Sequence, residues 1–90
     1  MSVIKPNIFR VVKRFPWRER SIKNLFRTSE SFRTLCEDYH LCAQALERWK
    51  ATDTEVSQAR VAEYSALMEG LEAEIIDTVD QYDKAQLEEV

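Results

Sequence analysis

The 90-residue chain contains one Gly, two Pro, two Cys and one His, and each of these shortages excludes something. So few turn-forming residues argue against a β-rich fold, which needs a turn after each short strand. Two cysteines do not form a disulfide framework, and we therefore expect a reducing location, the cytoplasm. Because there is no glycine-rich loop, no Cys-x-x-Cys pair and only one histidine, we do not expect an enzyme.

Long apolar runs are missing as well, since the unbroken apolar stretches are two or three residues long. Neither a membrane-spanning helix nor the apolar part of a secretory signal is expected from such a sequence. Hydrophobic residues still make up 44% of the chain and charged residues 32%, which excludes a disordered or collagen-like protein. A chain of this length has room for one hydrophobic core. We expect a single domain over residues 16–90, preceded by a basic N-terminal arm of residues 1–15.

The strongest pattern in the sequence is an apolar stripe whose members are three or four positions apart. This spacing places side chains on one face of a helix, and the serine and threonine before the stripe are suitable N-caps. The pattern predicts a helix over about 29–50, with Cys36 and Ala43 beside the stripe. The stripe itself consists of Phe32, Leu35, Tyr39, Cys42, Leu46 and Trp49.

A second stripe with the same spacing runs from Val61 to Tyr82 and predicts a helix over about 54–85. The polar segment between the two helices offers several caps: Thr52 with Glu55 in capping-box spacing, or else Asp53 or Thr54. Two amphipathic helices joined by so short a loop lie antiparallel. The predicted fold class is therefore all-α, an antiparallel helical hairpin.

Folding this hairpin about residue 52 pairs Tyr39 with Tyr64 and Leu35 with Met68. The second helix is longer than the first, so its end needs another cover. Pro16 is well suited to the first position of a short N-terminal helix, which we expect to lie along that end.

Charge is distributed very unevenly along the chain. Residues 1–34 carry a net charge of +7 and residues 35–90 a net charge of −10, and most of each lies in residues 5–27 and 70–90. Two interpretations are open: the two segments neutralise each other, or the basic arm binds an external anion such as nucleic acid or an anionic membrane surface. The candidate anion-binding residues are Arg10, Lys13, Arg14, Arg18 and Arg20.

The basic segment also contains four aromatic residues, Phe9, Phe15, Trp17 and Phe26. Cations mixed with aromatic rings suit single-stranded nucleic acid, and they equally suit an amphipathic helix at an anionic membrane. No sequence signature of a known nucleic-acid-binding fold accompanies them. For residues 1–15 two alternatives stay open, a brief helix from Pro6 or disorder.

One pair of residues has the spacing of two metal ligands: Cys36 and His40 lie four positions apart on the first helix. Two ligands do not complete a zinc site, and a catalytic thiolate would need a third, orienting group that is not evident. We therefore expect Cys36 beside the core and His40 in solvent. The carboxylates of the second helix lack a loop that could wrap a calcium ion. No metal, cofactor or small-molecule substrate is predicted.

A set of residues between positions 15 and 76 resembles the YdcH-like family, short bacterial proteins of unknown function. The resemblance implies an α-helical hairpin that self-associates, and it implies no known activity. The residues that carry it are Phe15-Pro16, Ile22, Leu25, Phe32, Leu35, Asp38-Tyr39-His40, Leu67, Leu71-Glu72 and Glu74-Ile75.

Two helices bury a single interface, which rarely suffices for a stable domain of this size. We therefore expect a homo-oligomer, most simply a two-fold dimer that forms a four-helix bundle with coiled-coil-like packing. The predicted function is that of a non-enzymatic interaction or scaffold protein with a protein partner; the alternative is an adaptor that binds nucleic acid or an anionic membrane through the basic arm. The predicted packing and interface residues are Phe32, Leu35, Tyr39, Leu46, Trp49, Tyr64, Leu67, Met68, Leu71 and Ile75.

Overall fold

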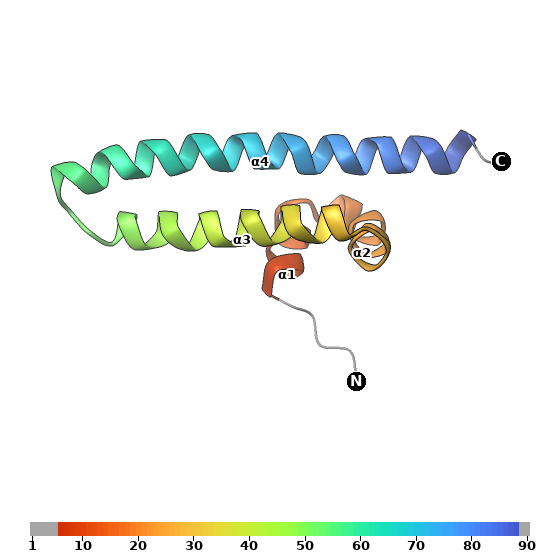
Figure 1. Cartoon of the computed structure of the whole chain (residues 1–90), viewed down its shortest axis with the longest axis horizontal. Helices are drawn as coiled ribbons and strands as arrows, with labels where there is room; N and C mark the ends of the chain where they lie inside the picture. The colour runs from red at the N-terminus through yellow and green to blue at the C-terminus, as the bar shows by residue number, and fades with distance from the viewer. Residues whose placement is uncertain (1–5, 89–90) are drawn as a thin grey trace.

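A computed structural model describes residues 6–88, and within this range the chain is helical without any strand. This confirms the predicted all-α fold class. Figure 1 shows two long helices with a group of shorter ones beneath one end. The elements in chain order are α1 (Pro6–Arg14), the single 3-10 turn η1 (Pro16–Arg18), α2 (Glu19–Thr28), α3 (Glu30–Lys50) and α4 (Glu55–Glu88).

The basic N-terminal arm lies partly outside the described residues, which begin at residue 6. Its described part forms α1, which is one of the two alternatives that the sequence left open. Ile8, Val11 and Phe15 follow one another at helical spacing and are all buried. The amide of Phe15 donates to the carbonyl of Val11 at 2.9 Å and so continues the last turn of α1. The division of the chain at residue 15 stays a prediction.

Helices α3 and α4 lie side by side and run in opposite directions (Figure 1). Ser29 caps α3, because its hydroxyl oxygen accepts from the amide of Phe32 at 3.1 Å. Of the caps proposed for the second helix, the structure uses Thr54. Its hydroxyl accepts from the amide of Ser57 at 3.1 Å, and the Ser57 hydroxyl accepts from the amide of Thr54 at 2.8 Å. This reciprocal pair satisfies two amides that the helix itself leaves without partners, and it explains why Ser57 is buried.

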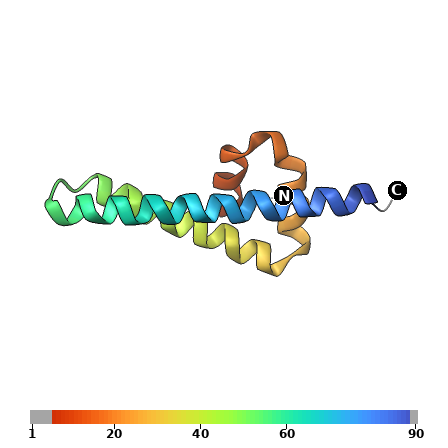
Figure 2. The same cartoon turned by 90° about the horizontal axis from the view of Figure 1, so that it is seen from above.

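The hydrophobic core is concentrated where all the helices meet. Seen from above in Figure 2, α3 crosses α4 obliquely, so that α1 and the first part of α3 lie on opposite sides of α4, and α2 passes beneath α4 to connect them. This arrangement encloses the end of the α3–α4 pair that is far from their connecting loop. The buried core cluster consists of Ile8, Val11, Phe15, Ile22, Leu25, Phe32, Cys36, Tyr39, Ile75 and Val79.

The buried face of α3 is rotated relative to the predicted stripe. Cys36 and Ala43, expected beside the stripe, are 0% and 3% exposed, whereas Leu35, Leu46 and Trp49 are only half-buried. The reason is that α3 packs against α1 as well as α4, so the centre of its buried face lies between the two neighbours. The apolar pattern of a single helix does not show that a second helix packs against it.

The pairing of Tyr39 with Tyr64 stays a prediction, and the hydrogen bonds of these two residues are made with other partners. The Tyr39 hydroxyl instead donates to Glu72 at 2.7 Å, and the backbone carbonyl of Tyr64 faces the Cys42 thiol at 3.6 Å. Side chains on a helix lean toward its N-terminus. In an antiparallel pair this lean moves the contacts toward higher residue numbers on both helices, which simple folding about residue 52 ignores.

Replacing Ser29 with alanine tests the cap of α3. Ser29→Ala leaves the amide of Phe32 without its side-chain acceptor and should lower the free energy of unfolding by about 1 kcal/mol. Ser29→Asp keeps an acceptor and should restore most of the loss. Ser31→Ala, an exposed position within the same helix, is the matched control and should have little effect. Urea denaturation measures all three; equal losses for Ser29→Ala and Ser31→Ala would contradict the cap.

Candidate functional site

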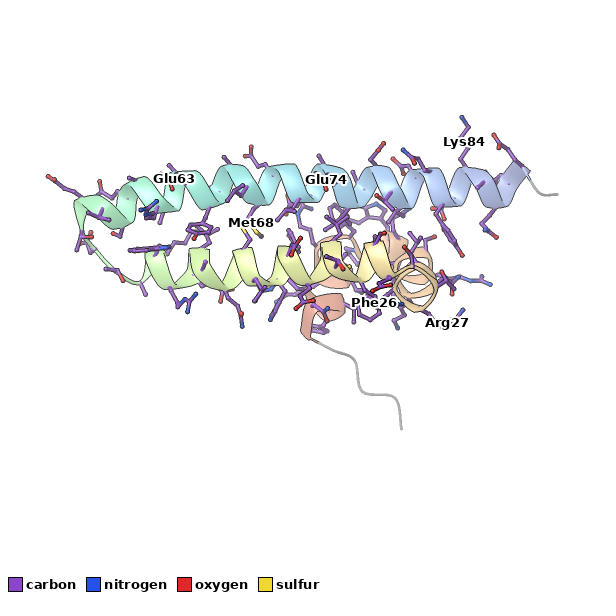
Figure 3. All side chains as sticks on the ribbon, in the orientation of Figure 1. Phe26, Arg27, Glu63, Met68, Glu74 and Lys84 are labelled. Atoms are coloured by element: carbon purple, nitrogen blue, oxygen red, sulfur yellow. The ribbon has the colours of Figure 1, made fainter. Side chains whose placement is uncertain are left out.

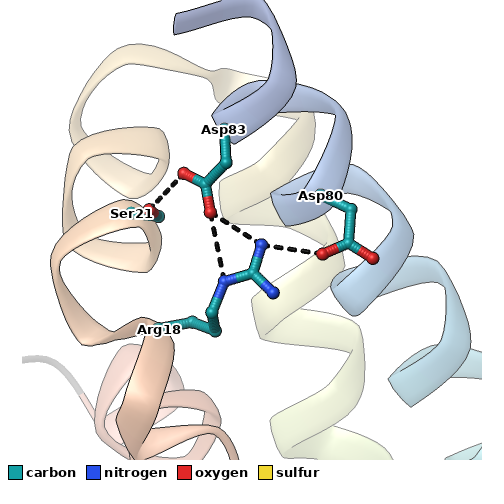
Figure 4. Close-up of polar contacts among 4 residues, drawn as sticks. All are labelled: Arg18, Ser21, Asp80 and Asp83. Atoms are coloured by element: carbon teal, nitrogen blue, oxygen red, sulfur yellow. Dashed lines mark hydrogen bonds and ion pairs between the residues drawn. The ribbon is translucent and has the colours of Figure 1, made fainter. Parts of the chain in front are cut away.

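The strongest polar cluster joins η1 and α2 to the end of α4 (Figure 4). The Arg18 guanidinium lies between two carboxylates one turn apart on α4: its Nη2 is 2.7 Å from Oδ1 of Asp80 and 2.6 Å from Oδ2 of Asp83. Nε of Arg18 also donates to Oδ2 of Asp83 at 3.1 Å, and Ser21 donates to the other oxygen of the same carboxylate. Four side chains from three elements therefore meet at one point.

These contacts change the acidity of the groups involved. Burial by itself raises the pKa of Asp83, but the hydrogen bonds from Ser21 and Arg18 and the charge of Arg18 together outweigh it and hold that pKa below its usual range. The hydrogen bonds to Asp80 and Asp83 raise the pKa of Arg18. Asp83 and Arg18 are therefore both charged at neutral pH.

A second cluster connects α1, α3 and α4 through Glu72. Its carboxylate accepts from Nε of Arg14 at 2.9 Å and from the Tyr39 hydroxyl at 2.7 Å. Burial and the hydrogen bond to Glu72 both raise the pKa of Tyr39, so its hydroxyl stays protonated and acts as the donor. Glu72 also raises the pKa of Arg14.

A third cluster fastens α1 to α3. Nε of Arg10 donates to Nδ1 of His40 at 3.1 Å, and its Nη1 donates to Glu47 at 3.0 Å. The expectation that His40 faces solvent is wrong: the residue is half-buried, because α1 covers this side of α3.

The five candidate anion-binding residues now divide into two groups. Arg10, Arg14 and Arg18 bind carboxylates of this same chain. Lys13 and Arg20 are exposed, and neither forms an ion pair within residues 6–88. The basic and acidic segments thus meet within one molecule, as one of the two interpretations of the charge pattern expects.

The ten predicted packing residues differ widely in burial. Phe32, Tyr39 and Ile75 are buried, and Leu67 is 56% exposed. Met68 points from α4 toward α3 (Figure 3). The half-buried members are Leu35, Leu46, Trp49, Tyr64, Met68 and Leu71.

Sequence analysis missed several residues that lie in the core or beside it. Ile8, Val11 and Phe15 have helical spacing in the sequence, but their segment was interpreted through its charge. A shallow groove between α3 and α4 was also missed, because it depends on how the two helices are placed. Its lining includes Phe32, Leu35, Asp38, Glu74 and Thr78.

The two cysteines are poorly suited to catalysis. Cys36 is completely buried, and burial raises the pKa of its thiol to about 12. Cys42 is half-buried, and burial raises its pKa as well. At neutral pH both groups are thiols rather than nucleophilic thiolates. Over the described residues, no three His, Cys, Asp or Glu side chains gather in a way that could hold a metal ion.

Comparison with known proteins adds no further constraint. No family model matches the chain, and neither a curated protein nor a solved structure is significantly similar to it. Within residues 6–88, none of the helices combines the length and the apolar character needed to cross a bilayer. The geometry of the chain itself is therefore the basis for any functional proposal.

Removing the carboxylate of Asp83 should produce a pH-dependent loss of stability. A depressed pKa in the folded state means that the stabilising effect is present above the unfolded pKa and is lost as the pH falls through the folded one. Asp83→Asn should therefore cost up to about 1 kcal/mol at neutral pH. The difference from wild type should disappear well below about pH 4.

Urea denaturation over this pH range measures the effect. Glu69→Gln is the control, since Glu69 is an exposed carboxylate on the same helix and makes no ion pair within the described residues. A loss for Asp83→Asn that stays constant at every pH would show that the carboxylate charge is not what stabilises the cluster.

Thiol labelling tests the assignment of the cysteines. With an aromatic disulfide reagent at neutral pH, the native Cys36→Ser variant should react through Cys42, and the native Cys42→Ser variant should react far more slowly. Both variants should react rapidly in denaturant. Fast reaction of native Cys42→Ser would mean that Cys36 is accessible and ionised, contrary to its burial.

Proposed function

We propose that this protein is a non-enzymatic helical interaction module that self-associates through the half of the α3–α4 hairpin nearest the connecting loop. This loop half comprises residues 41–71. The observation that carries the proposal is the uneven burial of apolar side chains along the hairpin. One end has a core formed by all the helices, whereas the loop half consists of α3 and α4, with α1 reaching α3 at Glu47.

The loop half contains many apolar residues, but few of its residues are buried. Only Ala43 and Ser57 are buried there. Leu41, Val56 and Leu67 are 53%, 61% and 56% exposed. Large exposed apolar side chains that gather in one region are typical of protein–protein contact surfaces. The loop half therefore has the composition of an interface rather than of a solvated surface.

The shape of the molecule supports the same proposal. Its radius of gyration is 15.0 Å and its extents are 54 × 31 × 22 Å. A compact domain of this length has a radius of gyration of about 12 Å. Part of the extra length is the two-helix layer of the loop half, and a layer of two helices has too little interior to bury its own apolar faces.

The free side of this layer is the one opposite α1. Arg14 of α1 contacts α4 at Glu72. Leu67 lies five positions before Glu72, which is not a whole number of helical turns, so the two side chains lie on different sides of α4. A second copy that packs its own free side against this one would produce four helices around a common interface. Completing the burial of a half-exposed leucine or tyrosine is worth roughly 1 kcal/mol. Since association itself costs several kcal/mol, we expect a reversible dimer.

Two further points bear on this proposal. The low cysteine content supports a cytoplasmic location for such a module. The alternative, an adaptor that uses all five candidate anion-binding residues, has less support, because Arg10, Arg14 and Arg18 already bind carboxylates of this chain.

A leucine-to-glutamate pair of variants tests the interface. Wild-type protein at micromolar concentration should scatter light as a particle of twice 10.6 kDa and dissociate on dilution. Leu67→Glu places a charge in the proposed interface and should give monomers at the same concentration. Light scattering coupled to size-exclusion chromatography measures both.

The matched control is Leu87→Glu, the same change on the same helix at a residue that is 76% exposed and outside the loop half. It should remain dimeric. A wild-type mass of 10.6 kDa at every concentration, or dissociation of both variants alike, would contradict an interface in the loop half.

A further inference from the structure

The outer side of α2 carries a row of cations that the clusters described above do not use. Arg20, Lys23 and Arg27 are all exposed, and their spacing of three and four positions places them on one face of the helix. Trp17, three positions before Arg20, is 67% exposed. We call Arg20, Lys23 and Arg27 the α2 basic face.

This face points away from the acidic helix α4. Ser21 is on the side of α2 that meets α4, because it donates to Asp83. Lys23 follows two positions later and so lies on the far side of the helix. Arg27 is also on the side of α2 away from α4 (Figure 3). The carboxylates of α4 therefore do not face these cations.

The cations have few partners within the described residues. Arg20 makes no ion pair there, and Lys23 has only a loose one with Glu19 at 3.8 Å, in which both side chains are about half exposed. Arg27 donates to the neutral amide oxygen of Asn24 at 3.1 Å. By contrast, Arg18 on the other side already holds two carboxylates. The outer face thus keeps a net positive charge on a molecule whose total charge is −3.

We propose that the α2 basic face, together with Trp17, binds the surface of a bilayer that contains anionic lipid. A bilayer is a flat anionic surface, so all cations on the convex side of one helix can approach it together without a groove. An exposed tryptophan at the edge of such a face suits the headgroup region, where its amphipathic ring is stable. Each cation near an anionic surface strengthens binding about fivefold.

The arrangement fits a nucleic acid less well. Single-stranded binding surfaces stack successive bases on aromatic rings placed along a cationic groove. Here the exposed ring comes before the row in the chain, and it forms an edge-to-face pair with the Phe15 ring, with the centroids 5.9 Å apart. The inference uses α2 and Trp17 alone and does not depend on dimer formation.

Vesicle co-sedimentation of the full chain tests the proposal. The probes are vesicles of phosphatidylcholine alone and vesicles in which part of it is replaced by phosphatidylserine. The test variant is the triple substitution Arg20→Gln, Lys23→Gln and Arg27→Gln, which removes three exposed positive charges from the α2 basic face. The matched control removes three exposed positive charges elsewhere, by Arg48→Gln, Lys50→Gln and Lys84→Gln.

Wild-type protein should bind the phosphatidylserine vesicles, bind the neutral ones far more weakly, and dissociate as salt is added. The test variant should bind on the order of a hundredfold more weakly, and the control should keep most of the wild-type affinity. Trp17→Ala should weaken binding without altering its dependence on salt. Circular dichroism of each variant shows whether it is folded, and a misfolded triple variant is replaced by the three single substitutions.

Three results would overturn the proposal: equal binding to both kinds of vesicle, no binding to either at low salt, or an equal loss for the test variant and the control. A single-stranded oligonucleotide is the competing probe. If wild type binds the oligonucleotide and not the vesicles, and the test variant loses that binding, the face belongs to a nucleic-acid site instead.

Discussion

The structure depends on the burial of the N-terminal segment against one end of two long helices. Ile8 and Val11 of α1, Phe15 just after it and Ile22 of α2 share the buried core with Ile75 of α4. Without them, α3 and α4 would have a single mutual interface, which is too small a core for a chain of this size. The segment that composition marks as a basic arm is therefore also a structural part of the fold.

The ion pairs have a different role from this apolar core. Most of the side chains in them are partly exposed, and such pairs are each worth about 0–1 kcal/mol. Their importance lies in placement: Arg10, Arg14 and Arg18 each fasten the N-terminal segment to a particular turn of α3 or α4. Arg10 and Arg14 lie four positions apart on α1 and so share one side of that helix, and Arg18 follows in η1. Lys13 and Arg20 form no ion pair within residues 6–88 and remain accessible to other partners.

Uneven coverage of the long helices connects the two proposals. The N-terminal segment covers only one end of the α3–α4 pair, and this leaves apolar residues of the loop half exposed. It also turns the outer side of α2 to solvent, away from the carboxylates of α4. The two surfaces lie at different ends of an elongated molecule. Self-association through one therefore leaves the other accessible, so a dimer would present two α2 basic faces.

The sequence by itself determined the two long helices and the all-α class, because the spacing of apolar residues and the positions of Ser29 and Thr54 act locally. The complementary charges of the two segments could also be predicted, though not which residues meet. Only the tertiary structure decided that Tyr39 bonds to Glu72, that His40 accepts from Arg10 and that Cys36 lies at the centre of the core. Each of these depends on a neighbouring helix distant in the chain, and periodicity within one helix contains no information about where that neighbour lies.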